Sequence, residues 1–217
     1  MDVEFRQINK HFGEVHANVN ISFTVPGGKI FGILGENGAG KSTLMKILSG
    51  FIQPDSGAIL LDGQQVTIDS PADAIKFGIG MLHQDPLDFP PMQIIDNFIL
   101  GQDGSLVLSH KEKIEEFLTL QSQFGFSLDP KATVDTLTVG ERQQMEILRL
   151  LRLGARVLIL DEPTTGISAQ QKDKLFAALH LLADEGKTII FVSHKLEDVE
   201  HLCGQLAILR KGALVGE

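Results

Sequence analysis

The stretch Gly35-Glu-Asn-Gly-Ala-Gly-Lys-Ser-Thr43 decides the fold that we predict for this chain. An apolar run at residues 30–34 precedes it, and a helical pattern that ends at Gly50 follows it. Strand, glycine-rich loop and helix, in that order, are the context of a phosphate-binding loop. The glycines let successive backbone N–H groups turn toward an anion, and the helix that starts at Lys41 adds the positive end of its dipole. The sequence therefore predicts a site for the phosphates of a nucleotide.

The side chains of this loop have separate expected roles. Lys41 would reach the β- and γ-phosphates, and the Ser42 hydroxyl would bind Mg²⁺. The residues predicted to contact nucleotide in this stretch are Gly35, Glu36, Asn37, Gly38, Ala39, Gly40, Lys41, Ser42 and Thr43.

Length and composition are those of a globular protein. The 217 residues are 43% hydrophobic and 22% charged, which is enough to bury a full core. The net charge of −9 argues against sequence-independent binding to nucleic acid or to anionic lipid. Apolar runs are too short to span a membrane, so we expect no direct membrane insertion, and membrane association would require a protein partner. The single cysteine, Cys203, excludes an internal disulfide and fits a reducing cytoplasm.

The order of hydrophobic patterns predicts an α/β fold. Alternating segments at residues 3–8 and 19–25, and a hairpin at 58–61 and 66–68, are typical of antiparallel strands. Apolar runs at 79–82, 157–160, 188–192 and 206–209 are typical of a buried parallel sheet. Between about residues 85 and 153 only helical periodicity is found, with expected helices at 92–100, from the Ser109 capping box to Gly125, and at 140–153. We predict one domain over 1–217, with residues 1–85 and 154–217 as the α/β core and 86–153 as an inserted helical subdomain.

Acidic residues end one of the apolar strands. Asp161 and Glu162 follow the run from Val157, and unpaired charge near a core is costly unless it has a use. Because adjacent strand residues point in opposite directions, one carboxylate can serve Mg²⁺ while the other faces a different position. Asp161 would hold the metal, and Glu162 would orient or deprotonate the attacking water in nucleotide hydrolysis.

Two further polar residues end predicted core strands. Gln84 follows residues 79–82, and His194 follows 188–192. In open α/β sheets ligands bind at the carboxyl ends of the strands. Gln84 could contact the metal and position water, and His194 could hydrogen-bond the γ-phosphate. Each of them alone would be read as an ordinary loop residue.

Together these motifs resemble the ATP-binding-cassette (ABC) ATPases over essentially the whole chain. The resemblance implies a P-loop NTPase core, with a RecA-like parallel sheet and an N-terminal antiparallel β-subdomain, and ATP and Mg²⁺ as its ligands. Gly35–Thr43 matches the Walker A motif and Val157–Glu162 the Walker B motif, with Glu162 as catalytic glutamate. Gln84 falls at the Q-loop and His194 at the switch histidine. Phe12 falls at the aromatic that stacks on adenine, although an apolar β-turn residue is the alternative there.

The signature motif of the family is altered in this chain. Leu137-Thr-Val-Gly-Glu141 lies where Leu-Ser-Gly-Gly-Gln would cap the γ-phosphate bound on an opposite cassette. Thr138 keeps a hydroxyl and Gly140 one glycine, whereas Val139 and Glu141 depart, and Glu141 would place a carboxylate near the partner's phosphates. Ser168 stands where the family often has the aspartate of its D-loop, which puts communication between two nucleotide sites in doubt.

These departures resemble the subgroup that serves bacterial importers of simple sugars and nucleosides, in which two cassettes usually lie in tandem. The resemblance implies an ATPase subunit with a second cassette and transmembrane permease subunits as partners, peripheral on the cytoplasmic face of the cell membrane. The groove beside residues 85–93, with Phe89, Pro90 and Pro91, would receive the permease. We expect the chain to be the first cassette of a tandem protein or a truncated reading frame, with the C-terminal end of the cassette cut short.

Three other hypotheses remain. A soluble cassette ATPase of translation or DNA repair would usually carry basic linkers or coiled-coil arms, and salt-sensitive binding of nucleic acid would favour it. A phosphate-loop kinase or GTPase would lack the elements at Gln84 and His194. A non-hydrolysing regulatory cassette would bind ATP without turnover.

Overall fold

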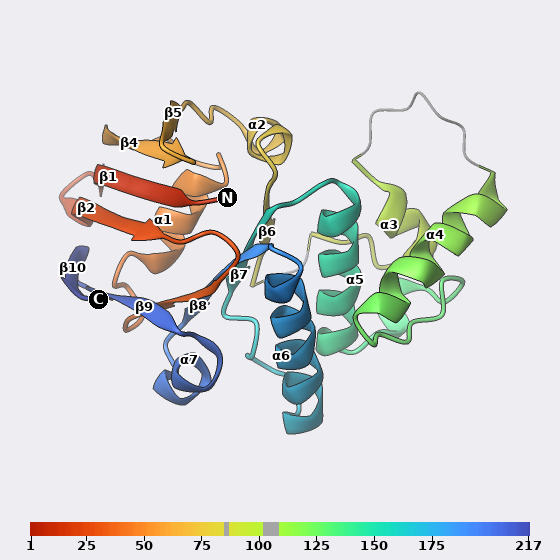
Figure 1. The fold of residues 1–217 in the computed structure, drawn as a ribbon. Coiled ribbons are helices and arrows are strands. Elements are labelled where there is room, and N and C mark those ends of the chain that lie inside the picture. Colours follow the sequence, from red (N-terminus) through yellow and green to blue (C-terminus); the bar gives the residue numbers. More distant parts are fainter. Residues whose placement is uncertain (85–86, 102–108) are drawn as a thin grey trace.

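The computed structural model describes residues 1–84, 87–101 and 109–217, which form two sheets with helices beside and between them (Figure 1). The strands are β1 (Val3–Phe12), β2 (Val15–Val25), β3 (Ile30–Leu34), β4 (Ser56–Leu61), β5 (Gln64–Val66), β6 (Ile79–Leu82), β7 (Val157–Asp161), β8 (Thr188–Ser193), β9 (Gln205–Arg210) and β10 (Ala213–Gly216). The helices are α1 (Lys41–Leu48), α2 (Pro71–Lys76), α3 (Ile94–Ile99), α4 (His110–Gln123), α5 (Val139–Arg152), α6 (Ala169–Asp184) and α7 (Leu196–Leu202), with a 3₁₀ turn η1 (Val134–Thr136). The P-loop NTPase fold predicted from the sequence is confirmed.

The N-terminal strands form an antiparallel sheet in the order β2-β1-β4-β5. β1 and β2 are longer than predicted, because their hairpin stays paired as far as Phe12 and Val15. β5 lies two residues earlier than predicted. Asp62 and Gly63 both have positive φ (49° and 79°), and such a two-residue turn pairs the flanking residues directly, so that Leu61 pairs with Gln64.

The second sheet has the order β10-β9-β3-β8-β7-β6, with β9, β3, β8, β7 and β6 parallel and β10 antiparallel at the edge. Every residue of β7 and β8 is buried, as predicted for strands covered on both faces. The carboxyl ends of β3, β6, β7 and β8 share one edge of this sheet. The predicted motifs therefore meet there.

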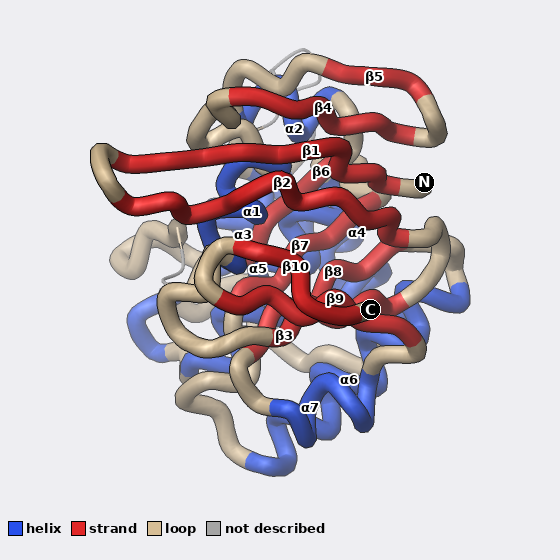
Figure 2. The backbone as a smooth tube through the Cα atoms, turned by 90° about the vertical axis from the view of Figure 1, so that its left-hand side faces the viewer, coloured by secondary structure: helices blue, strands red, loops and turns tan. Residues whose placement is uncertain are grey.

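α1 lies between the two sheets, and Figure 2 views the molecule from the side of the antiparallel sheet. Its apolar residues Leu44, Met45, Ile47 and Leu48 are at most 1% exposed. They join Phe5, Phe31 and their neighbours in one hydrophobic cluster that spans both sheets. Burial of a Leu or Ile side chain contributes about 1.5–3 kcal/mol, so this packing fixes the helix that follows the phosphate-binding loop.

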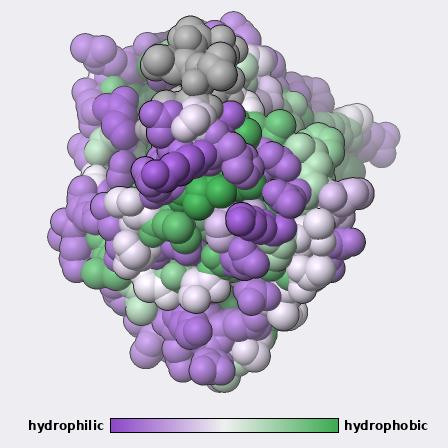
Figure 3. All heavy atoms as spheres, turned by 90° about the vertical axis from the view of Figure 1, so that its right-hand side faces the viewer, coloured by the Kyte–Doolittle hydropathy of each residue, from purple (hydrophilic) through white to green (hydrophobic). Residues whose placement is uncertain are grey.

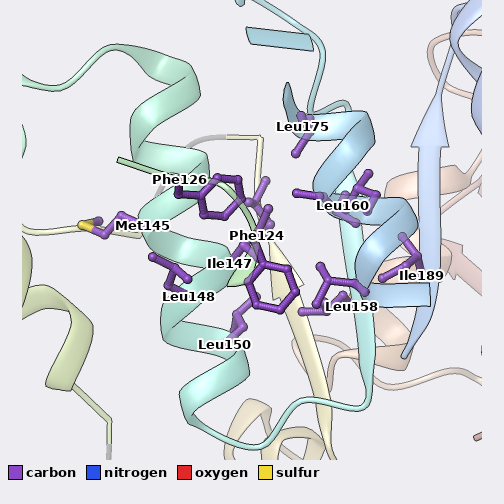
Figure 4. Packing of buried hydrophobic residues seen from close by; sticks show 14 of the residues in the cluster. Phe124, Phe126, Met145, Ile147, Leu148, Leu150, Leu158, Leu160, Leu175 and Ile189 are labelled. Carbon is purple, nitrogen blue, oxygen red and sulfur yellow. The ribbon is translucent and has the colours of Figure 1, made fainter. Parts of the chain in front are cut away.

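The opposite face of the parallel sheet is covered by α5, α6 and α7 (Figure 1). Leu158, Leu160 and Ile189 of the sheet point toward Leu150 of α5 and Leu175 of α6 (Figure 4). The same cluster continues into the helical segment, where the rings of Phe98 and Phe117 meet edge to face at 5.1 Å. A continuous core thus connects the helical segment with the sheet.

The helical segment confirms the predicted capping box at the start of α4, where Ser109 accepts from the Glu112 N–H and Glu112 accepts from the Ser109 N–H. α3 is shorter than the predicted helix at 92–100, because Gln93 forms a β-bridge with Thr133 and holds the chain extended. The face at this end of the molecule is largely hydrophilic, with a hydrophobic band below the residues drawn in grey (Figure 3). Among the described residues, no helix is both long and apolar enough to cross a membrane.

Candidate functional site

The phosphate-binding loop is seated closely against two strands. A Cβ at Gly35 would overlap the carbonyl oxygen of Leu209 in β9, and a Cβ at Gly40 would overlap that of Ala17 in β2. Gly40 also has φ 98°, a conformation that side chains disfavour. Asn18 secures the contact, because its Nδ2 donates to the Gly40 carbonyl at 3.1 Å. These close contacts and this hydrogen bond fix the conformation of the loop backbone.

The Lys41 side chain folds back onto the phosphate-binding loop and bonds its backbone. Its Nζ donates to the carbonyl oxygens of Gly35 at 2.7 Å and Glu36 at 3.2 Å, and the residue is 6% exposed. Residues 37 and 38, at the exposed tip of the loop, take no part in this contact. The result is a buried cation held against the backbone of the loop, beside the position that a phosphate group would occupy.

Asp161 and Glu162 lie in different local structures, Asp161 at the end of β7 and Glu162 in the turn that follows it. β7 ends at Asp161, so the strand pleat does not set the direction of Glu162. Glu162 instead has φ 52°, while its N–H still donates to the Val192 carbonyl at 3.0 Å. A non-glycine residue in this region is strained, and such strain is typical of functional sites. The turn carries the Glu162 carboxylate to the edge of the sheet.

The Glu162 carboxylate lies between two basic side chains. Its Oε2 is 2.7 Å from Nδ1 of His194, and its Oε1 is 3.7 Å from Nζ of Lys41. Its side chain is 11% exposed, whereas that of His194 is 42% exposed. The structure thus brings together three residues that are distant in the sequence: Lys41 lies 121 positions before Glu162, and Glu162 lies 32 positions before His194. Lys41 starts α1, Glu162 follows β7, and His194 follows β8.

Asp161 fits a metal ligand. It is 5% exposed, and within the described part of the chain its buried Oδ1 has no hydrogen-bond partner. A buried carboxylate oxygen without a donor is costly, and coordination of a cation would satisfy it. Ser42 is the second residue of α1, which follows β3 at the same edge of the parallel sheet, so its hydroxyl and the Asp161 carboxylate are oxygen donors of the type that Mg²⁺ prefers.

Gln84 and Phe12 are two predicted site residues whose side chains are exposed. Gln84 lies two residues beyond the end of β6 and is exposed at the same sheet edge. Phe12 ends β1 and is 50% exposed, with Nζ of Lys10 at 5.4 Å from the ring centroid. Their contacts with a nucleotide stay predictions.

The altered signature begins α5, and its polar groups are bonded to one another. The Thr138 hydroxyl donates to Glu141 Oε2 at 2.7 Å, and the same oxygen accepts from the Thr138 N–H at 2.9 Å. Glu141 therefore occupies the N-terminus of its own helix with a carboxylate, the type of group that this end attracts. Gly140 lies in the first turn and is buried.

Sequence reasoning missed a buried network behind the site. Asp198 of α7 is 3% exposed, and it accepts from the Thr164 hydroxyl at 2.6 Å and from Lys172 Nζ at 3.0 Å. Burial alone would raise the pKa of Asp198, but the hydrogen bonds from Thr164 and Lys172 outweigh it and lower the pKa below its ordinary value. The network links the segment after Glu162 to α6 and α7. An acidic residue in the first turn of α7 was the only sequence signal for it.

A glycine-rich loop between a buried strand and a helix, with an acidic pair at the end of another parallel strand of the same sheet, defines a phosphate-loop nucleotide-binding protein. The sequence profile of the ABC transporter family matches residues 19–165. The chain belongs to this family.

Curated relatives resemble the chain over its whole length. It is 39% identical to the "Ribose import ATP-binding protein RbsA" of Chromobacterium violaceum over 220 residues, which cover 100% of this chain and 44% of the relative. It is also 39% identical to the "Arabinose import ATP-binding protein AraG" of Rhizobium johnstonii, over 98% of this chain and 43% of the relative. The chain therefore spans less than half the length of these proteins.

Solved structures agree with the fold. A nucleotide-free ATP-binding cassette from an ABC transporter superposes with a TM-score of 0.89 at 24% identity, covering 100% of this chain and 90% of that one. The "Dimeric Structure of MJ0796, a Bacterial ABC Transporter Cassette" superposes with a TM-score of 0.84 at 21% identity, covering 99% of this chain and 97% of that one.

Proposed function

We propose that this chain is an ATP-binding and ATP-hydrolysing cassette that powers the import of a simple sugar or nucleoside. The observation that carries the proposal is the position of the Glu162 carboxylate, between Lys41 and His194 at the end of the phosphate-binding loop. The names of the curated relatives, which are import proteins for ribose and arabinose, support the transport role and favour a sugar over a nucleoside.

The residues of the site have distinct roles in this proposal. The backbone N–H groups of residues 35–43 bind the phosphates, and Lys41 exchanges its two carbonyl contacts for phosphate oxygens. Glu162 orients the attacking water and accepts its proton, while His194 holds the Glu162 carboxylate in place and hydrogen-bonds the γ-phosphate. Phe12 stacks on the adenine ring.

Ser42, Asp161 and Gln84 would hold Mg²⁺ in this site. The ion would neutralise charge that develops on the phosphate oxygens during hydrolysis. The buried Oδ1 of Asp161 supports this assignment, because it has no hydrogen-bond partner among the described residues.

The site is completed by a second cassette in this proposal. Thr138, Gly140 and Glu141 would face the nucleotide bound on the partner, and Ser168 would lie beside them at the start of α6. The dimeric cassette among the structural neighbours supports such pairing. A tandem partner on the same polypeptide fits the length of the relatives, of which the chain covers 44%.

Permease subunits would dock beside the segment that follows Gln84. Phe51, Leu87 and Phe89 are 44%, 57% and 55% exposed, and such exposure of large apolar side chains is typical of an interaction surface. Asn97, which is 2% exposed, bonds the backbone N–H and carbonyl of Phe89 and so fixes its position. Asp85 and Pro86 of the predicted docking segment lie outside the described residues. This contact would place the protein on the cytoplasmic face of the membrane.

The rate of ATP hydrolysis tests the proposal. Glu162→Gln keeps the size of the side chain but removes the base, and loss of a general base costs about 10²- to 10⁴-fold in rate. Glu200→Gln, on the exposed face of α7, is the matched control and should hydrolyse ATP at the parent rate. Equal rates in Glu162→Gln and Glu200→Gln would remove Glu162 from the mechanism. A parent protein that binds ATP without turnover would instead identify a regulatory cassette.

A further inference from the structure

Gln171 joins the starts of two helices that the proposed function uses. α5 is capped by Thr138 and α6 by Ser168, and each helix closes its own capping box, through Glu141 and Gln171 respectively. Gln171 differs from Glu141 because its side chain also reaches the other helix.

Both ends of the Gln171 carboxamide are used. Oε1 accepts from the Ser168 N–H at 3.0 Å, and Nε2 donates to the Thr138 hydroxyl oxygen at 2.8 Å. The backbone N–H of Gln171 donates to Ser168 Oγ at 3.3 Å. A glutamate here could close the capping box, since that needs only an acceptor, but its carboxylate could not donate to Thr138. The bond between α6 and α5 therefore requires the amide N–H of Gln171.

Gly140 provides the space for this bridge. It has a helical backbone, so its conformation does not require glycine. A Cβ at this position would lie 3.0 Å from both Cδ and Nε2 of Gln171, which is closer than carbon and nitrogen atoms ordinarily approach. The bridging side chain thus packs directly on the glycine of the signature segment.

The two bridged helices connect different parts of the site. α6 follows the segment that runs from Glu162 through Thr164 to Ser168, and Thr164 is tied to Asp198 of α7. α5 begins at Thr138–Glu141, the surface that would meet a second cassette. The Thr138 hydroxyl accepts from Gln171 while it donates to Glu141, so the orientation of this surface depends on the bridge.

We propose that Gln171 is a positioning residue that makes the signature surface at Thr138–Glu141 move together with the segment after Glu162. The proposal rests on the function proposed above. Gln171 touches neither nucleotide nor water in this role. It links the N-terminus of α6 to the N-terminus of α5, so that a displacement of one displaces the other.

The test compares Gln171→Glu with Gln170→Glu in the full-length protein. Gln170 is the adjacent residue of α6 and is exposed, so the control introduces the same charge at the same helix end without breaking the bridge. Loss of one partly exposed hydrogen bond corresponds to about a fivefold change, or about 1 kcal/mol. We expect Gln171→Glu to lower kcat for ATP about fivefold relative to Gln170→Glu, with the Kd for ATP within about twofold.

A double-mutant cycle separates positioning from a purely structural role. In a Thr138→Ala background the bridge is already broken, so Gln171→Glu should lower kcat no further. A fivefold loss that persists in that background would overturn the proposal, as would equal kcat values for Gln171→Glu and Gln170→Glu. A lower Tm with an unchanged rate per folded molecule would also overturn it. A parent protein without ATPase activity would overturn the proposed function and this role together, whereas the other results concern Gln171 alone.

Discussion

The hydrogen bond between Thr164 and Asp198 offers a sharp test of the buried network behind the site. Both residues are at most 4% exposed, and the Thr164 hydroxyl donates to Asp198 Oδ2 at 2.6 Å. Thr164→Val has nearly the same shape and removes only the hydroxyl, which leaves a buried carboxylate oxygen without that donor. The Lys172 bond to the other carboxylate oxygen stays in place.

The expected magnitude follows from the charge of the acceptor. A hydrogen bond to a buried charged group contributes about 1.5–3 kcal/mol to the free energy of unfolding. In a domain of this size each kcal/mol shifts Tm by about 2–4 °C, so Thr164→Val should lower Tm by about 3–12 °C. Thermal unfolding followed by circular dichroism measures this shift.

Thr165→Val is the matched control, because Thr165 is the next residue and its side chain is exposed. Exposed substitutions usually change stability by less than about 0.5 kcal/mol. If Thr164→Val and Thr165→Val unfolded at the same temperature, the buried bond would not contribute to stability, and the network could not hold the segment after Glu162.

Three further predictions concern pH, the phosphate-binding loop and His194. Because the pKa of Asp198 is lowered in the folded protein, its contribution to stability is present above the unfolded pKa of about 3.9 and is lost as the pH falls through the folded pKa. The Tm difference between the parent and Thr164→Val should therefore shrink in measurements below about pH 4, and a constant difference would contradict this. Gly40→Ala should lose more stability and ATP binding than Gly38→Ala, because both have positive φ but only the Cβ at Gly40 meets backbone; equal losses in Tm and in Kd would contradict the close seating of the loop. His194→Ala should lower kcat about 10- to 100-fold through loss of its bond to Glu162, with little change in the Kd for ATP; an unchanged kcat would contradict its role.

Features that depend on near neighbours in the chain could be predicted from the sequence. The capping box at Ser109 was predicted from a four-residue pattern and is confirmed. The fully apolar strands β7 and β8 were found from their composition, since a strand buried on both faces has no polar side. The meeting of Lys41, Glu162 and His194 followed from the rule that ligands bind at the carboxyl ends of parallel strands.

Features that depend on distant atoms could not be predicted. The left-handed φ of Glu162 leaves no trace in a strand pattern, so the sequence treated Glu162 as a strand residue, whereas the structure places it in a turn after β7. The bond from Gln171 to Thr138 spans 33 residues and that from Thr164 to Asp198 spans 34, and nothing in either segment identifies its partner. The register of β5 depended on a turn whose geometry only the backbone angles reveal.

The central claim is that Glu162 activates water for ATP hydrolysis in the loop that Lys41 closes. The most direct measurement is the identity of the nucleotide that stays bound after the protein is incubated with ATP and Mg²⁺, separated by gel filtration and analysed by chromatography. We expect ADP from the parent and from Glu200→Gln, and intact ATP from Glu162→Gln. Recovery of ADP from Glu162→Gln in the same amount as from the parent would contradict the claim.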